Sequence, residues 1–218
     1  QTFLNRFGVV VGKTPAVLTS HDSAWHTAFD MAEAGAEVAA IVDTREIVDI
    51  GLQDRAKELS IPVKLGHTAT ATRGRLRIKG VRMNPVRAGS VGSGHWVFCD
   101  ALLTCGGWTP SLHLFSHTKG ALDWDADARV YLPGCKSEAV QIAGAGRGLW
   151  GIGAALDDGA KAAADALKAL GKSASVPSYK VQKDRIGTGV FHKELPTDRS
   201  PGKAKAFVDF QNDVTAKD

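Results

Sequence analysis

Closely spaced glycines between residues 144 and 151 could bring the main chain close to a phosphate. The segment from Gly146 to Gly151 reads Gly-Arg-Gly-Leu-Trp-Gly and matches the G-x-G-x-x-G pattern of dinucleotide-binding turns. Glycine permits close backbone approach to a pyrophosphate, and the N-terminus of a following helix supplies unpaired N–H groups and partial positive charge. We expect a strand over Ala139 to Ala143 before this turn and an alanine-rich helix to about Leu170 after it. The pattern therefore indicates a nucleotide-binding turn.

The same segment lacks the rest of a self-contained dinucleotide site. A complete βαβ unit needs a second strand that ends in an acidic residue about 20 residues further on. Asp165 falls inside the expected helix, and the helix leads into a segment rich in Lys, Ser and Pro. Two interpretations stay open. The segment closes a larger dinucleotide domain that begins upstream, or its glycines only allow a strand and a helix to pack closely.

A second glycine turn follows the expected buried strand from Ala101 to Cys105. It reads Gly106-Gly107-Trp108-Thr109-Pro110. Paired glycines after a strand allow the backbone to turn sharply beside a ligand. A plain turn fixed by Pro110 is the alternative.

A third turn, from Thr19 to Ala24, links an expected strand to an expected helix but contains no glycine. Asp22 and Ser23 offer an N-cap, and a carboxylate there would repel a phosphate. Asp43 ends the next expected strand, where a ribose-binding acid would stand, and Arg45 follows it. The sequence therefore predicts a structural βαβ unit here more readily than a nucleotide site.

Other chemistry finds little support. The three cysteines and seven histidines show no metal-ligand spacing, so we assign no metal site and no catalytic residue. The unpaired cysteines fit a cytoplasmic setting. No leader peptide and no membrane-spanning run is visible.

The net charge of +4 permits an anionic ligand. Arg73, Arg75, Arg77 and Lys79 recur with period two and predict a solvated strand face. A phosphate-binding strip is the alternative, and without interleaved aromatic residues nucleic-acid binding is not expected.

The elements that position these turns predict an α/β fold. Short apolar runs alternate with helical patterns up to Leu65, which predicts a parallel sheet with right-handed crossovers. Short alternating stretches broken by glycine follow, as in a β-meander. We expect a three-layer nucleotide-binding fold like that of the disulfide reductases. The expected units are a Rossmann-like subdomain with its meander (1–105), the closing part of an FAD/NAD-binding domain (106–171), a linker (172–205) and the start of a further domain (206–218), with a helix opening at Asp213.

Three stretches of the chain resemble the α subunit of heterotetrameric sarcosine oxidases. They are Thr19 to Arg45, Gly106 to Leu114, and Ala206 to Asp218, of which the last, with Phe207-Val208-Asp209-Phe210, is the most specific. The resemblance covers nearly the whole chain and is weakest from Ser173 to Lys203. It implies an internal piece of that subunit, inactive by itself.

The resemblance also implies a biochemical setting. The α subunit would bind NAD in a domain built like the FAD domain of disulfide reductases, beside β, γ and δ subunits. FAD and FMN would serve amine oxidation in the β subunit. Tetrahydrofolate would bind a C-terminal domain absent from this chain. The complex would convert sarcosine to glycine with release of hydrogen peroxide and methylene-tetrahydrofolate.

The resemblance carries ligand roles to two turns only. They are Gly106, Gly107 and Pro110, and Gly144, Ala145 and Gly146, with Gly148 added from the glycine pattern. Ala145 stands where flavin-binding relatives carry an aspartate, which favours NAD over FAD. Two alternatives remain: the α subunit of a related opine, proline or dimethylglycine dehydrogenase, or a non-catalytic scaffold domain.

Overall fold

The first half of the chain forms a parallel sheet covered on both faces. In the computed structural model, residues 1–88, 90–135, 139–181, 207–209 and 214–215 are described. The parallel sheet has the order β3 (Val63–Leu65), β2 (Ala40–Asp43), β1 (Pro15–Thr19) and β8 (Ala101–Cys105). The α/β class and the parallel sheet predicted from the sequence are confirmed.

Two helices cover one face of this sheet. They are α2 (Asp22–Glu33) and α3 (Ile50–Glu58). Val17 and Ile41 point to this side and pack with the apolar stripe of α2, in which Trp25 is fully buried. The helix ends near Gly35, as the sequence predicts. The short α1 (Thr2–Phe7) was not predicted, and it adds only Leu4 to this core.

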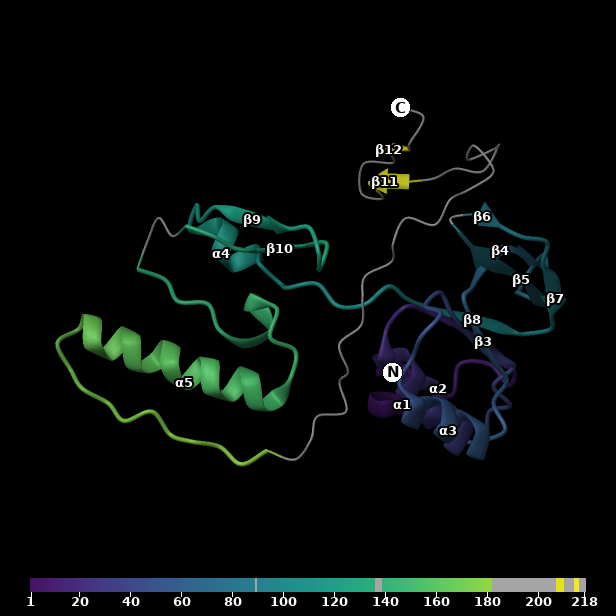
Figure 1. The fold of residues 1–218 in the computed structure, drawn as a ribbon, viewed down its shortest axis with the longest axis horizontal. Helices are drawn as coiled ribbons and strands as arrows, with labels where there is room; N and C mark the ends of the chain where they lie inside the picture. The colour runs from purple at the N-terminus through teal and green to yellow at the C-terminus, as the bar shows by residue number, and fades with distance from the viewer. Residues whose placement is uncertain (89, 136–138, 182–206, 210–213, 216–218) are drawn as a thin grey trace.

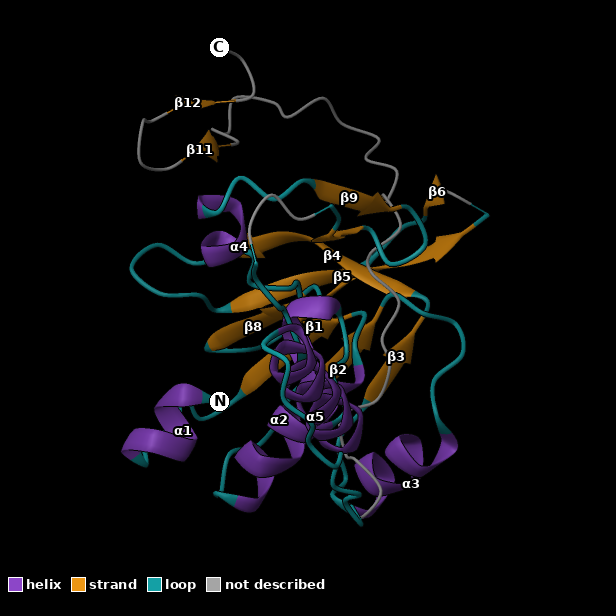
Figure 2. Cartoon of the chain, turned by 90° about the vertical axis from the view of Figure 1, so that its left-hand side faces the viewer, coloured by secondary structure: helices purple, strands orange, loops and turns teal. Residues whose placement is uncertain are grey.

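An antiparallel meander covers the opposite face (Figures 1 and 2). It comprises β4 (His67–Arg73), β5 (Gly80–Arg87), β6 (Ser90–Val91) and β7 (His95–Val97). Val81 and Met83 of β5 are fully buried against Ala16, Ala40 and Val42, the residues that alternate with the helix-facing ones. The three-layer arrangement of helices, parallel sheet and meander is therefore confirmed.

The predicted basic strand face was wrong. Arg73 ends β4, whereas Arg75, Arg77 and Lys79 lie in the connection between β4 and β5. A turn at Gly74, whose φ is +136°, ends the period-two pattern before the other three side chains can share a face. Arg73 instead lies over the ring of Trp96.

The chain beyond β8 forms a second group of elements (Figure 1). These are α4 (His113–His117), the hairpin β9 (Leu122–Asp125) with β10 (Val130–Pro133), the 3-10 turn η1 (Gly144–Arg147) and α5 (Ile152–Ala169). The long helix is confirmed, but residues 139–143 are irregular, so the strand expected there was wrong. A strand needs a hydrogen-bonded neighbour, and none of the described strands pairs with this segment.

The C-terminal region also differs from the expectation. Phe207–Asp209 and Val214–Thr215 pair as the antiparallel strands β11 and β12, where the sequence predicted the start of a helix at Asp213. Val and Thr at 214 and 215 favour an extended chain over a helix. Most of the predicted linker, residues 182–205, lies outside the described residues.

Candidate functional site

The two predicted glycine turns meet at one pocket of about 200 Å³. It lies just beyond the carboxyl ends of β1 and β8, where ligands bind in open α/β sheets. Its lining includes His21, Trp108, Asp125, Arg147, Gly148 and Trp150, together with small and apolar residues of the β9–β10 hairpin. Trp108 belongs to the turn after β8, and Arg147 and Gly148 belong to the turn at η1. Segments distant in sequence therefore form a single site.

His21 is the N-cap of α2 and a wall of the pocket. The backbone N–H of Ser23 donates to its Nδ1 at 3.1 Å. Sequence reasoning placed the cap on Asp22 and Ser23, and this was wrong because the helix begins at Asp22. Since Nδ1 accepts a hydrogen bond, the neutral imidazole carries its proton on Nε2. Burial lowers the pKa of His21, although Asp22 and Asp43 act in the opposite direction.

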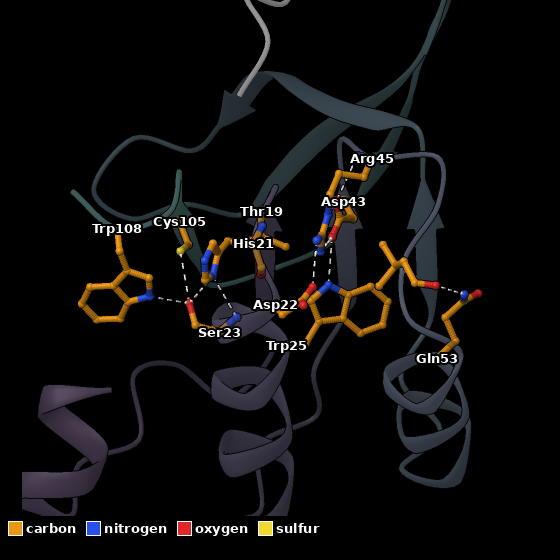
Figure 3. Close-up of polar contacts among 11 residues, drawn as sticks. Thr19, His21, Asp22, Ser23, Trp25, Asp43, Arg45, Gln53, Cys105 and Trp108 are labelled. Atoms are coloured by element: carbon orange, nitrogen blue, oxygen red, sulfur yellow. Dashed lines mark hydrogen bonds and ion pairs between the residues drawn. The ribbon is translucent and has the colours of Figure 1, made fainter. Parts of the chain in front are cut away.

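Ser23 connects the β1–α2 turn to the turn after β8 (Figure 3). Its hydroxyl lies 2.9 Å from Nδ1 of His21 and accepts a hydrogen bond from Trp108 Nε1 at 3.2 Å. Cys105 Sγ lies 3.8 Å from the same oxygen. The indole of Trp108 is thereby fixed at the pocket wall, although the side chain is about half exposed.

The place expected for a ribose-binding acid is closed by internal contacts (Figure 3). The carboxylate of Asp43 is fully buried and accepts hydrogen bonds from Trp25 Nε1 at 2.8 Å and from Arg45 Nε and Nη2 at 3.0 and 2.8 Å. Arg45 Nη1 also donates to Asp22 at 2.7 Å. A ribose hydroxyl would have to displace these partners, so the β1–α2–β2 unit does not fit a dinucleotide in the usual way.

Hydrogen bonds to Asp158 of α5 fix the η1 turn. The N–H of Gly144 donates to Asp158 Oδ2 at 2.9 Å, and Arg147 donates to Oδ1 of the same carboxylate at 2.6 Å. Gly144 and Gly148 have φ of +62° and +78°, which favour glycine whether or not a ligand binds. Because the N–H of Gly144 already donates to Asp158, it is not available to donate to a ligand. Ala145 is exposed in this turn.

The predicted ligand residues fall into two groups. Gly148 lines the pocket, and Gly106, Gly107 and Pro110 flank Trp108 in the turn after β8. Gly144, Ala145 and Gly146 form the η1 turn next to Arg147. Sequence reasoning missed His21, Asp125 and Trp150 as pocket residues. Trp150 lies inside the glycine pattern, but Asp125 carries no recognisable sequence pattern.

The described residues offer few other reactive groups. No group of histidine, cysteine or acidic side chains among them could hold a metal ion. Cys99 is buried, and burial raises the pKa of its thiol, so it is a poor nucleophile. None of the described helices is long and apolar enough to cross a membrane.

No protein-family model matches the chain. One solved structure with a similar fold is the HOCl-induced flavoprotein disulfide reductase RclA of Escherichia coli. It has a TM-score of 0.53 and 14% sequence identity, and covers 74% of this chain and 37% of that one. This likeness agrees with an FAD/NAD(P)-binding type of fold.

Two curated relatives align with the whole chain. Sarcosine oxidase subunit alpha of Rhizobium meliloti (strain 1021) is 32% identical over 219 residues, which are 100% of this chain and 21% of the relative. The subunit of the same name from Corynebacterium sp. (strain P-1) is 28% identical, over 100% of this chain and 23% of the relative. The chain thus spans about a fifth of the length of these relatives. Over its whole length, the chain is homologous to the sarcosine oxidase alpha subunit.

Proposed function

We propose that this chain is the nucleotide-binding region of a sarcosine oxidase α subunit and that it holds part of an NAD molecule. The observation that supports this most is the meeting of the two glycine turns at one pocket beyond the sheet. In the complete complex, α would work with β, γ and δ subunits to convert sarcosine to glycine, hydrogen peroxide and methylene-tetrahydrofolate. FAD and FMN would act in the β subunit, and tetrahydrofolate would bind elsewhere in α. We assign no catalytic residue to this chain.

The pocket suits one end of a dinucleotide. Its volume of about 200 Å³ is below the roughly 300–1,000 Å³ of sites that enclose a drug-sized ligand, so it would hold a single ring. The pyrophosphate would lie outside it, next to the η1 turn. Ala145 is exposed there and offers no carboxylate for a flavin ribityl chain, which favours NAD over FAD. Bound NAD would supply hydride chemistry, whereas this chain would bind and orient it.

The second group of elements supports a division of the site between this chain and further polypeptide. None of the residues of α5 is buried, although Ile152 and Leu156 lie on it. Residues 139–143 pair with none of the described strands. We therefore propose that residues 106–171 close a larger FAD/NAD-binding domain and that residues 1–105 are a subdomain inserted into it. Residues 206–218 would begin the next domain.

The substitution Ala145→Asp in the full-length protein tests the ligand role of the η1 turn. A new carboxylate beside the pyrophosphate would repel it. Because about 1.4 kcal/mol corresponds to a tenfold change in affinity, we expect NAD retained after purification to fall about tenfold. Bound NAD would be measured after denaturing release.

The matched control is Ala163→Asp, which adds the same charge to an exposed position of α5 away from the turn. It should retain NAD as the unmodified protein does. Equal NAD content in both variants and the unmodified protein would remove the η1 turn from the site. A complete absence of NAD from the unmodified protein, in purification and on titration, would contradict the proposed function itself.

A further inference from the structure

The outer face of the meander combines arginine side chains with an exposed tryptophan. Arg82 of β5 alternates with the buried Val81 and Met83, so it points away from the parallel sheet. Its partner in register on β7 is Trp96, which is exposed. The guanidinium carbon of Arg73, at the end of β4, lies 5.1 Å from the centre of the Trp96 ring. Two positive charges therefore accompany one indole on the solvent side of the meander.

The connection between β4 and β5 extends this surface. Leu76 is 97% exposed there, and it stands between the exposed Arg75 and Arg77. The connection is short and closed at its base, because the N–H of Lys79 donates to the carbonyl oxygen of Arg73 at 2.7 Å. The loop thus presents a large apolar side chain to water between two positive charges. We call the whole surface the basic face; it consists of Arg73, Arg75, Leu76, Arg77, Arg82 and Trp96.

The charge of the basic face is not neutralised within the described part of the chain. None of the ion pairs found there includes any of its four arginines. Solvated charged surfaces are common, but solvation alone does not account for an almost fully exposed leucine and an exposed indole beside the charges. Arginine and tryptophan are enriched at protein interfaces, where they often supply much of the binding energy. The composition therefore indicates an interface with an acidic protein surface.

The loop of the basic face lies at the end of the parallel sheet opposite to the pocket. Arg77 is within electrostatic range of Asp100, whose carboxylate accepts hydrogen bonds from the N–H groups of Lys13 and Thr14, just before β1. The loop is therefore near the amino ends of β1 and β8, whereas the pocket lies beyond their carboxyl ends. Figure 1 also shows the meander far from α4, β9, β10 and α5. The polypeptide proposed to complete residues 106–171 is thus expected away from this surface.

We propose that the basic face binds an acidic surface of a separate subunit of the assembled enzyme, with Leu76 in an apolar recess of that surface. Homology to an α subunit implies a complex with other subunits. Carboxylates of the partner pair with the arginine guanidinium groups, and the leucine and the indole exclude water from these pairs. The proposal rests on the multisubunit assembly proposed above but does not depend on NAD binding.

Thiol labelling tests whether a partner covers the loop. In Leu76→Cys, the introduced thiol should react with a maleimide about tenfold more slowly in the assembled enzyme than in the full-length α subunit alone, because an interface excludes water and reagent. Peptide mass spectrometry separates this thiol from the native cysteines. The control is Ile47→Cys, at a position 88% exposed between β2 and α3, which should react equally fast in both samples. Equal rates at position 76 would overturn the proposal. Slow labelling already in α alone would also overturn it, because the α chain itself would then cover the loop.

Charge reversal tests the chemistry of the partner and needs only the assembled enzyme. Arg75→Glu places a negative charge against an acidic surface, so we expect the dissociation constant of the complex, measured by sedimentation on dilution, to rise about tenfold. The matched control is Lys57→Glu, at an exposed position of α3 on the opposite side of the sheet, which should leave assembly unchanged. Unchanged assembly in Arg75→Glu would overturn the proposal. Normal assembly with loss of binding to a single-stranded oligonucleotide would assign the surface to nucleic acid and overturn it equally. The NAD content should be the same in both variants, so a failure here leaves the proposed nucleotide role intact.

Discussion

His21 has a structural role and also a place in the pocket. It caps α2 through Nδ1, and it is one of the residues that line the pocket. The cap requires the neutral ring, because a protonated Nδ1 cannot accept the Ser23 N–H. Burial, the largest influence, lowers the pKa of His21, and Arg45 adds to this, while Asp22 and Asp43 oppose it. The fold therefore keeps this histidine neutral at physiological pH.

The lowered pKa of His21 predicts a loss of stability in mild acid. In the unfolded chain the imidazole has its ordinary pKa of 6.5, so below that pH the unfolded state binds a proton that the folded state resists. The free energy of unfolding should be level in this respect above pH 6.5 and fall as the pH decreases towards the folded-state pKa. Urea unfolding between pH 5 and 7.5 would measure this.

The variant His21→Asn provides the comparison. Asparagine is a good N-cap and can accept the Ser23 N–H, but it does not titrate in this range. Its stability should therefore fall less between pH 7 and pH 5 than that of the unmodified protein. The same pH dependence in both proteins would assign the acid sensitivity to other groups.

At the scale of elements, Arg45 fastens the end of β2 to the start of α2. Its guanidinium bonds to Asp43 and Asp22, and Asp43 is fully buried. Arg45→Met would leave that carboxylate with Trp25 as its remaining side-chain donor. We expect a loss of about 3–5 kcal/mol in the free energy of unfolding, the usual result of removing one partner from a buried pair. Urea denaturation would measure it.

Arg55→Met is the matched control for Arg45→Met. Arg55 pairs with Glu33 and Glu58 at similar distances, but all three side chains are about half exposed or more. Solvent screens such pairs, so the substitution should hardly change stability. If both variants lose equal stability, the Asp43–Arg45 pair does not hold these elements together as its burial implies.

The sequence predicts those elements that depend mainly on residues close together in the chain. β1, α2 and β8 follow from apolar runs, helical spacing and a glycine stop, and Trp108, Arg147 and Trp150 lie inside turns already recognised from their glycines. The β9–β10 hairpin and its Asp125 were missed, because their place at the pocket depends on tertiary contacts. The strand expected at residues 139–143 failed for a related reason, since an apolar run becomes a strand only beside another strand.

At the scale of the whole molecule, the buried apolar side chains are unevenly distributed between the two parts of the chain before and after Cys105. The two clusters of buried apolar side chains lie within residues 1–105. Beyond Cys105, the buried hydrophobic side chains of the described residues are Leu112, Phe115 and Val130. The pocket thus joins a well-packed unit to one whose own core is small. This imbalance agrees with the proposal that residues 106–171 complete a domain formed together with other polypeptide.

Amide hydrogen exchange would test this imbalance. A helix in a folded protein owes most of its stability to tertiary packing. The helix α5 has no buried residue, and Ile152 is 56% exposed and Leu156 40% exposed. In the polypeptide of residues 1–218, the α5 amides should exchange about 100-fold faster than those of α2, which packs in the core. In the full-length protein the difference should largely disappear, because further chain would cover α5. The helix α2 serves as the internal control in both samples. Strong protection of α5 in the 218-residue polypeptide would mean that these residues need no additional partner, and the proposed division of the nucleotide domain would then be wrong.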